Sequence, residues 1–143
     1  MPCSTTGSSN LQQTGPVIEV FISPSAALRK QLEIQGKTSV APVKKSFLID
    51  TGASSTVMKT GIAKELGLIP KGQIPVHTPS STNFVCYTYD VDFILPQHAA
   101  ISNLLVCEAP LEGQDIDGLL GRDILRMGIL IYTGYANQFT LAM

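Results

Sequence analysis

The chain has 143 residues, of which 44% are hydrophobic and 15% are charged, and its formal net charge is −1. This near-neutral charge, without a basic run longer than Lys44-Lys45, argues against a nucleic-acid partner. No stretch approaches the roughly 20 apolar residues of a membrane helix, so we also expect no membrane partner. One folded domain with its own hydrophobic core fits this length and composition.

Residues 1–15 are rich in serine, threonine, glutamine and glycine, which predicts a disordered polar tail ahead of a folded domain at residues 16–143. The tail lacks the basic and apolar regions of a secretory signal, so we expect a cytoplasmic protein. The cysteines Cys3, Cys86 and Cys107 are odd in number and lack metal-ligand spacing. We interpret them as free thiols and expect no metal ion and no cofactor.

The first half of the chain shows short runs of β-branched and aromatic residues separated by turns. Strands are predicted at residues 17–22, 28–34 and 39–50. After residue 50, a short helix is predicted at 60–66, with Thr60 as its cap and Gly67 as its end.

A long strand at residues 85–95 has alternating character. Its apolar face comprises Val85, Tyr87, Tyr89, Val91, Phe93 and Leu95. The other face carries Asp90 and Asp92, which we expect to face water. A further strand is predicted at 103–107.

The last part of the chain contains the sequence Gly118-Leu119-Leu120-Gly121, which predicts a buried strand that other backbone approaches closely at both glycines. A short helix is predicted at 123–127, with Asp123 near its positive end. A hairpin is predicted from residues 129–132 and 138–141. Together these elements predict a mainly β domain, either a barrel or a sandwich.

Asp50 stands at the end of the apolar run Phe47-Leu48-Ile49 and is followed by a turn of small residues, 51–55. A carboxylate delivered there by a buried strand is costly unless donors surround it or a second charge perturbs it. That cost indicates a functional site. The alternative is a turn aspartate that accepts bonds from backbone N–H groups.

The motif Asp50-Thr51-Gly52-Ala53, followed about seventy residues later by Leu119-Leu120-Gly121-Arg122-Asp123, resembles the retropepsin-like aspartic proteases. The likeness covers roughly residues 17–141. It implies a mainly β, closed-barrel acid protease fold with one or two short helices. It also implies one lobe per chain and a homodimer.

The resemblance implies an aspartic-type endopeptidase that acts on a peptide or protein substrate. Two carboxylates sharing one proton activate a water molecule, and since the chain has one such motif, the second Asp50 comes from an identical subunit. Thr51, Gly52, Gly121 and Arg122 are implied to support the active-site loop. The strands at residues 17–21 and 139–141 are candidates for an intersubunit sheet.

Two parts of the chain are implied to contact substrate. One is the active-site loop at Ala53 and Ser54, where Ser54 replaces the acidic residue of many viral members. The other is a flap at residues 77–82, with Thr78, Pro79, Ser80 and Ser81 as candidate contacts and without the glycine-rich tip of viral flaps. An alternative function is a retropepsin-like dimerisation or peptide-binding module with little or no proteolytic activity.

Overall fold

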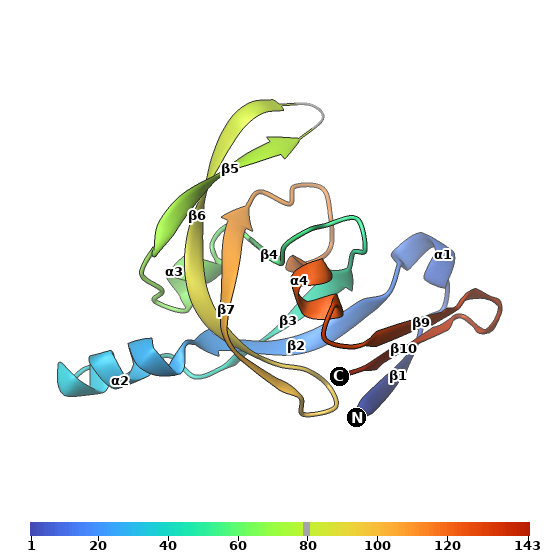
Figure 1. Ribbon diagram of the computed structural model, residues 1–143, viewed down its shortest axis with the longest axis horizontal. Helices are drawn as coiled ribbons and strands as arrows, with labels where there is room; N and C mark the ends of the chain where they lie inside the picture. The colour runs from blue at the N-terminus through green and yellow to red at the C-terminus, as the bar shows by residue number, and fades with distance from the viewer. Residues whose placement is uncertain (79–80) are drawn as a thin grey trace.

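A computed structural model describes residues 1–78 and 81–143, with the side chains of residues 76–84 outside the description. Six strands form a closed barrel, because β2 pairs with β3 on one side and with β6 on the other (Figure 1). In order around the barrel, they are β2 (Val17–Pro24), β3 (Val43–Ile49), β8 (Gly118–Leu120), β4 (Val57–Lys59), β7 (Ala100–Ala109) and β6 (Ser81–Ile94).

The barrel interior is filled by apolar side chains, among which Phe47 and Phe93 meet edge to face with their ring centroids 5.2 Å apart. A Cβ at Gly118 would overlap the ring of Phe47 and come within 2.5 Å of the Val57 carbonyl oxygen. The close approach predicted at this glycine is therefore confirmed.

A second, three-stranded sheet joins the two ends of the chain. It consists of β1 (Cys3–Gly7), β10 (Gln138–Ala142) and β9 (Ile129–Thr133), with β10 in the middle. The hairpin predicted at 129–132 and 138–141 is thus confirmed. Because β10 already has a neighbour on each side, residues 139–141 are not free to pair with another subunit in this arrangement.

The prediction of a disordered tail at residues 1–15 is wrong. Beyond β1, this segment forms the helix α1 (Leu11–Thr14), and the side chain of Leu11 is completely buried. Asn137 secures the helix, since its Oδ1 accepts a hydrogen bond of 3.0 Å from the Leu11 N–H. The polar residues of the segment form a strand because β10 supplies backbone partners for them.

The strand predicted at residues 28–34 is also wrong, because these residues belong to the helix α2 (Ala26–Ile34). Ser25 caps the helix by accepting a hydrogen bond of 3.3 Å from the Leu28 N–H. Arg29 fixes it to the barrel through an ion pair of 3.2 Å with Asp92. Asp92 is therefore largely covered, with a side chain 13% exposed, rather than solvated as expected.

Two short helices lie near their predicted positions, α3 (Ile62–Glu65) and α4 (Arg122–Leu125). The residue at the start of α3 is Gly61 rather than Thr60, and Glu108 accepts hydrogen bonds from the N–H groups of Gly61 and Ala63 there. A 3₁₀ turn, η1 (Gly134–Ala136), connects β9 to β10.

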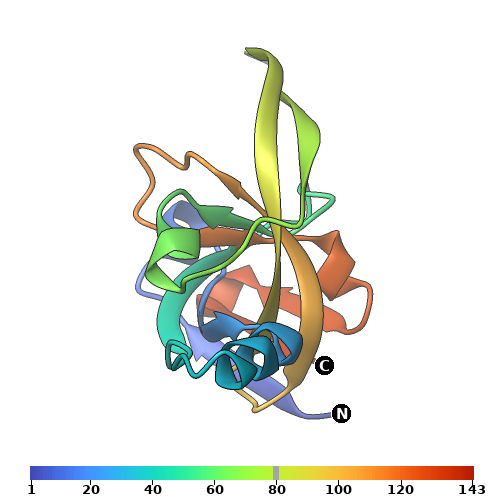
Figure 2. The ribbon, with the colours of Figure 1, turned by 90° about the vertical axis from the view of Figure 1, so that its left-hand side faces the viewer.

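The strands β5 (Gly72–Thr78) and β6 pair as a hairpin that stands away from the barrel (Figure 2). The predicted alternation of β6 holds only in part. Tyr89, Val91 and Phe93 are buried as expected, whereas Val85 and Tyr87 are about half exposed. The buried face changes between Thr88 and Tyr89, where β6 passes from the barrel into the hairpin.

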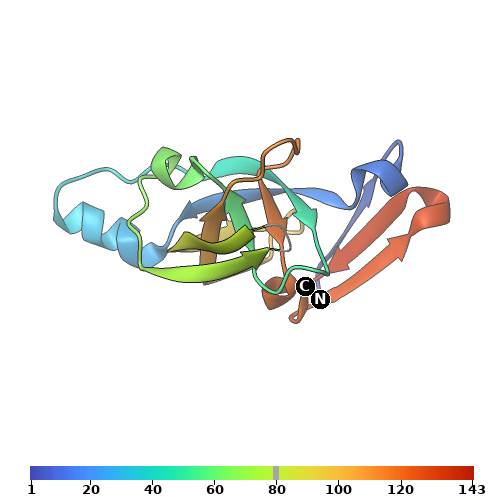
Figure 3. The same cartoon turned by 90° about the horizontal axis from the view of Figure 1, so that it is seen from above.

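Seen from above, the molecule is elongated, with α2 at one end and the sheet of β1, β9 and β10 at the other (Figure 3). In the described part of the chain, no helix is both long and apolar enough to cross a membrane.

Candidate functional site

Asp50 directly follows β3 and is half-buried. Its position results from the parallel pairing of β3 with β8, in which Ile49 lies opposite Leu120. The pairing continues one step further, since the Asp50 N–H donates a hydrogen bond of 3.0 Å to the Leu120 carbonyl. The two sequence motifs thus lie side by side, although about seventy residues separate them.

The turn after Asp50 folds back onto its carboxylate. The Gly52 N–H donates a hydrogen bond of 2.8 Å to Asp50 Oδ1, and the Ala53 N–H donates one of 3.2 Å to the Asp50 carbonyl. A Cβ at Gly52 would lie 3.0 Å from Oδ1, so glycine leaves the room that this bond needs. Within the described part of the chain, the other carboxylate oxygen, Oδ2, accepts no hydrogen bond.

Arg122 holds this turn at two points. Its Nη1 donates a hydrogen bond of 2.7 Å to the Thr51 carbonyl, and its backbone N–H donates one of 2.9 Å to the Ala53 carbonyl. Arg122 therefore bonds to two backbone carbonyls of the loop, in which Ser54 follows Ala53. The side chains of Thr51 and Ser54 are exposed.

Gly121 lies directly beneath the same loop. A Cβ there would come within 2.5 and 2.6 Å of the carbonyl carbon and oxygen of Ser55. Any other residue at this position would push the loop away from β8.

Thr56 and Asp123 also belong to the site. The sequence interpretation did not predict that these two residues connect the loop after Asp50 to the start of α4. The two oxygens of Asp123 accept hydrogen bonds of 2.9 Å from the Thr56 N–H and 2.8 Å from the Thr56 hydroxyl. That hydroxyl in turn accepts a bond of 3.1 Å from the Gly121 N–H. Asp123 also accepts from the Ile124 N–H, as expected of a residue at a helix start.

The flap candidates fall at the limit of the described residues. Thr78 and Ser81 lie opposite each other in the pairing of β5 with β6. Their side chains lie outside the description, as do Pro79 and Ser80 entirely.

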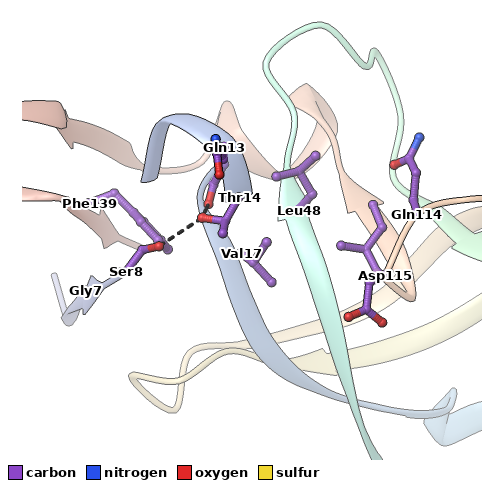
Figure 4. A pocket seen from close by; sticks show the side chains of 11 residues that line it. Gly7, Ser8, Gln13, Thr14, Val17, Leu48, Gln114, Asp115 and Phe139 are labelled. Atoms are coloured by element: carbon purple, nitrogen blue, oxygen red, sulfur yellow. Dashed lines mark hydrogen bonds between the residues drawn. The ribbon is translucent and has the colours of Figure 1, made fainter. Parts of the chain in front are cut away.

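A cavity of about 590 Å³ opens beside β3 (Figure 4). Its lining residues come from the N-terminal segment, from β2, from β3, from β10 and from the loop before β8: Gly7, Ser8, Gln13, Thr14, Gly15, Val17, Leu48, Gln114, Asp115, Ile116 and Phe139. Because the pairing with Leu120 continues to Asp50, strand alternation directs Leu48 and Asp50 to the same side of the sheet. Leu48 lines the cavity and Asp50 does not, so the cavity lies two residues along the chain from the carboxylate.

The cysteines play no evident part in this site. All three are free, and Cys86 and Cys107 are buried. Burial raises the pKa of the Cys86 thiol, and burial together with the neighbouring Cys86 raises the pKa of Cys107 to about 11. Both thiols therefore stay protonated and poorly nucleophilic near neutral pH. In the described residues, no group of three or more His, Cys, Asp or Glu side chains is arranged to hold a metal ion.

The sequence matches the family model described as aspartyl protease over residues 31–124, about two-thirds of the chain. The chain belongs to the aspartyl protease family. The matched range contains Asp50 and its turn, Gly121, Arg122 and Asp123, so both motifs of this aspartyl protease fall within it.

Solved structures similar to this aspartyl protease include the retropepsin-like aspartic protease from Rickettsia conorii, with a TM-score of 0.52 and 20% identity over 99% of this chain and 95% of that one. This likeness confirms the predicted retropepsin-like fold. The EIAV protease complexed with the inhibitor HBY-793 matches with a TM-score of 0.48 and 22% identity, over 84% and 92% of the two chains. The retroviral protease-like domain of Ddi1 from Leishmania major matches at 0.43 and 14%, over 81% and 80%. No curated protein matches the chain.

Proposed function

We propose that this aspartyl protease is an endopeptidase whose active site forms when two identical chains bring their Asp50 carboxylates together. The observation that carries the proposal is the geometry of the Asp50 turn. Gly52 orients one carboxylate oxygen, Arg122 and Gly121 hold the turn, and Thr51 and Gly52 are exposed at its surface. A carboxylate held in this way has an oxygen left for a water molecule and for a second carboxylate.

The chemistry requires that second carboxylate. Two like charges about 3 Å apart cannot both ionise, so the pair shares one proton. The ionised member takes a proton from the attacking water, while the protonated member donates a hydrogen bond to the scissile carbonyl. The proton then passes to the leaving nitrogen as the peptide bond breaks, which restores the pair.

The sheet of β1, β9 and β10 is the surface we propose for dimerisation. Its three strands have five residues each and contain no charged side chain. On its outer face, Ile129 and Ile131 of the edge strand β9 are 53% and 54% exposed. Uncharged, apolar edge strands associate readily unless a partner covers them. The sheet is also near the site, because α4, which begins with Arg122, leads into β9 after three residues.

In this proposal, an extended peptide lies across the paired Asp50 turns, with the β5–β6 hairpin as its cover. Ala53 and Ser54 are placed to contact it from below, and Thr78, Pro79, Ser80 and Ser81 are the candidate contacts from the hairpin. The cavity beside Leu48 accepts one of its side chains.

Replacing Asp50 by asparagine tests the proposal, because the amide keeps the shape of the side chain but cannot accept the proton from water. We expect the wild type to cleave peptides in a diverse mixture and Asp50→Asn to lose at least about 100-fold in rate. Glu33→Gln, which removes an exposed carboxylate on α2, is the control and should cleave like the wild type.

Mass spectrometry of the products measures cleavage by the wild type and by both variants, and sedimentation shows whether each protein is a dimer. Equal cleavage by wild type and Asp50→Asn would refute the proposed role of Asp50. A folded dimer that cleaves nothing between about pH 3 and pH 8 would instead favour a peptide-binding or dimerisation module.

A further inference from the structure

The cavity beside Leu48 combines apolar lining residues with a single charge. Val17, Leu48, Ile116 and Phe139 supply the apolar part. Among the described residues that line the cavity, Asp115 is the only one with a charged side chain. A cavity of this composition favours a ligand with an apolar stem and a positive end.

The other polar groups of the lining do not compete with this charge. The hydroxyls of Ser8 and Thr14 are hydrogen-bonded to each other at 2.9 Å, as Figure 4 shows. Gln13 and Gln114 also line the cavity with neutral amides, and an amide oxygen accepts hydrogen bonds from a cation as a carboxylate does. The lining thus offers neutral hydrogen-bond acceptors in addition to the Asp115 carboxylate.

The wall formed by the N-terminal segment is fixed before any ligand binds. Leu11 is buried, its N–H is bonded to Asn137, and its carbonyl accepts a bond of 3.3 Å from the Tyr132 hydroxyl. Gly15, with φ of +68°, closes the helix against β3, where a Cβ would lie 2.6 Å from Leu48 Cδ1. A preformed wall of this kind reduces the entropy lost on binding and so supports selectivity.

We propose that this cavity binds a lysine or arginine side chain of the substrate and that Asp115 determines this preference. The inference rests on the proposed function and adds a substrate class to it. The aliphatic stem of the basic residue packs on Leu48, Val17 and Ile116, and its charged end meets the Asp115 carboxylate.

The position of the cavity sets where the basic residue stands in the substrate. Leu48 and Asp50 are about 7 Å apart along β3, which corresponds to about two residues of an extended peptide. The basic residue therefore lies within about two residues of the scissile bond. In a two-fold dimer, the same cavity is present on each side of the cut.

A peptide library with every residue type on both sides of the cut tests this inference. We expect the wild type to enrich lysine or arginine at one or more of these positions, and Asp115→Asn to reduce the enrichment about fivefold. The matched control is Glu112→Gln, an exposed carboxylate of the same loop that does not line the cavity, and it should keep the preference. Raising the ionic strength should weaken the wild-type preference and leave Asp115→Asn unchanged.

A second measurement distinguishes a loss of substrate preference from a general loss of activity. Cleavage of a peptide with norleucine in place of lysine should be equal in wild type and Asp115→Asn. Asp50-dependent cleavage without a basic preference, or a preference that survives in Asp115→Asn, would overturn this inference and leave the proposed function standing. Absence of any Asp50-dependent cleavage would overturn both.

Discussion

Thr56 is the residue that joins the two motifs of the site. Its hydroxyl donates to Asp123 and accepts from the Gly121 N–H, and its own N–H donates to the second oxygen of Asp123. The side chain is completely buried, so water cannot replace these bonds. A small hydroxyl residue thus holds the loop after Asp50 against the helix that begins with Arg122.

Replacing Thr56 by valine keeps the shape of the side chain and removes the hydroxyl. The Gly121 N–H then loses its partner, and we expect the free energy of unfolding to fall by about 2–4 kcal/mol. Urea denaturation measures this change. The exposed Thr60 provides the control, since Thr60→Val should alter stability by less than about 0.5 kcal/mol. Equal midpoints for the two variants would contradict the role assigned to Thr56.

At the scale of elements, Arg29 tethers the helix α2 to the barrel. None of its residues is fully buried, and Arg29 connects it to the barrel by bonding Asp92, the Ser23 hydroxyl and the Pro24 carbonyl. Asp92 also accepts a bond of 2.9 Å from the Asn103 N–H. The Arg29–Asp92 ion pair is partly buried. The side chains of Lys44 and Glu19, which form another ion pair, are both more than half exposed.

We therefore expect Arg29→Met to lower the free energy of unfolding by about 1–2 kcal/mol, because it leaves a covered carboxylate without its cation. Amide exchange should quicken in α2 in particular. Lys44→Met, which breaks the exposed pair, should change stability by less than about 0.5 kcal/mol. If α2 exchanged at the same rate in both variants, the tether would not be what holds it.

The same elements show what the sequence could and could not reveal. The barrel strands that lead into Asp50 and Gly121 were predictable because their apolar runs and glycines are local signals. The helix α2 also had a local signal, the capping residue Ser25, which the strand interpretation of residues 28–34 overlooked. Thr56 and Asp123 are 67 positions apart in the chain, and Leu11 and Asn137 are 126 positions apart. No periodicity in the sequence indicates that these residues are in contact.

At the scale of the whole molecule, the elongated shape separates two ends of different character. The α2 end carries charged residues such as Arg29, Lys30 and Glu33, whereas the strands of the terminal sheet carry no charge. Only the second end adjoins the Asp50 turn through α4 (Figures 1 and 3). A dimer formed through the terminal sheet would therefore leave α2 free at both outer ends.

Ile131→Lys tests that dimer. A lysine on the outer face of β9 places a charge within an uncharged interface, and we expect the dissociation constant of the dimer to rise about tenfold or more. Analytical ultracentrifugation measures it. The control is Ile34→Lys at the end of α2, where the side chain is 79% exposed and no change is expected. An unaltered dissociation constant for Ile131→Lys would direct attention to another face.

The pairing of β1 with β10 has a consequence for the order of events during synthesis. Thr5 and Thr140, whose hydroxyls are 2.8 Å apart, are separated by 135 positions in the chain. A nascent chain therefore carries β1 and α1 without their partner until β10, the last strand, has left the ribosome, after the Asp50 turn and β8 have emerged. The wall of the cavity formed by the N-terminal segment and β10 is thus completed last. The Asp50 turn would therefore form in the growing chain before the cavity is complete.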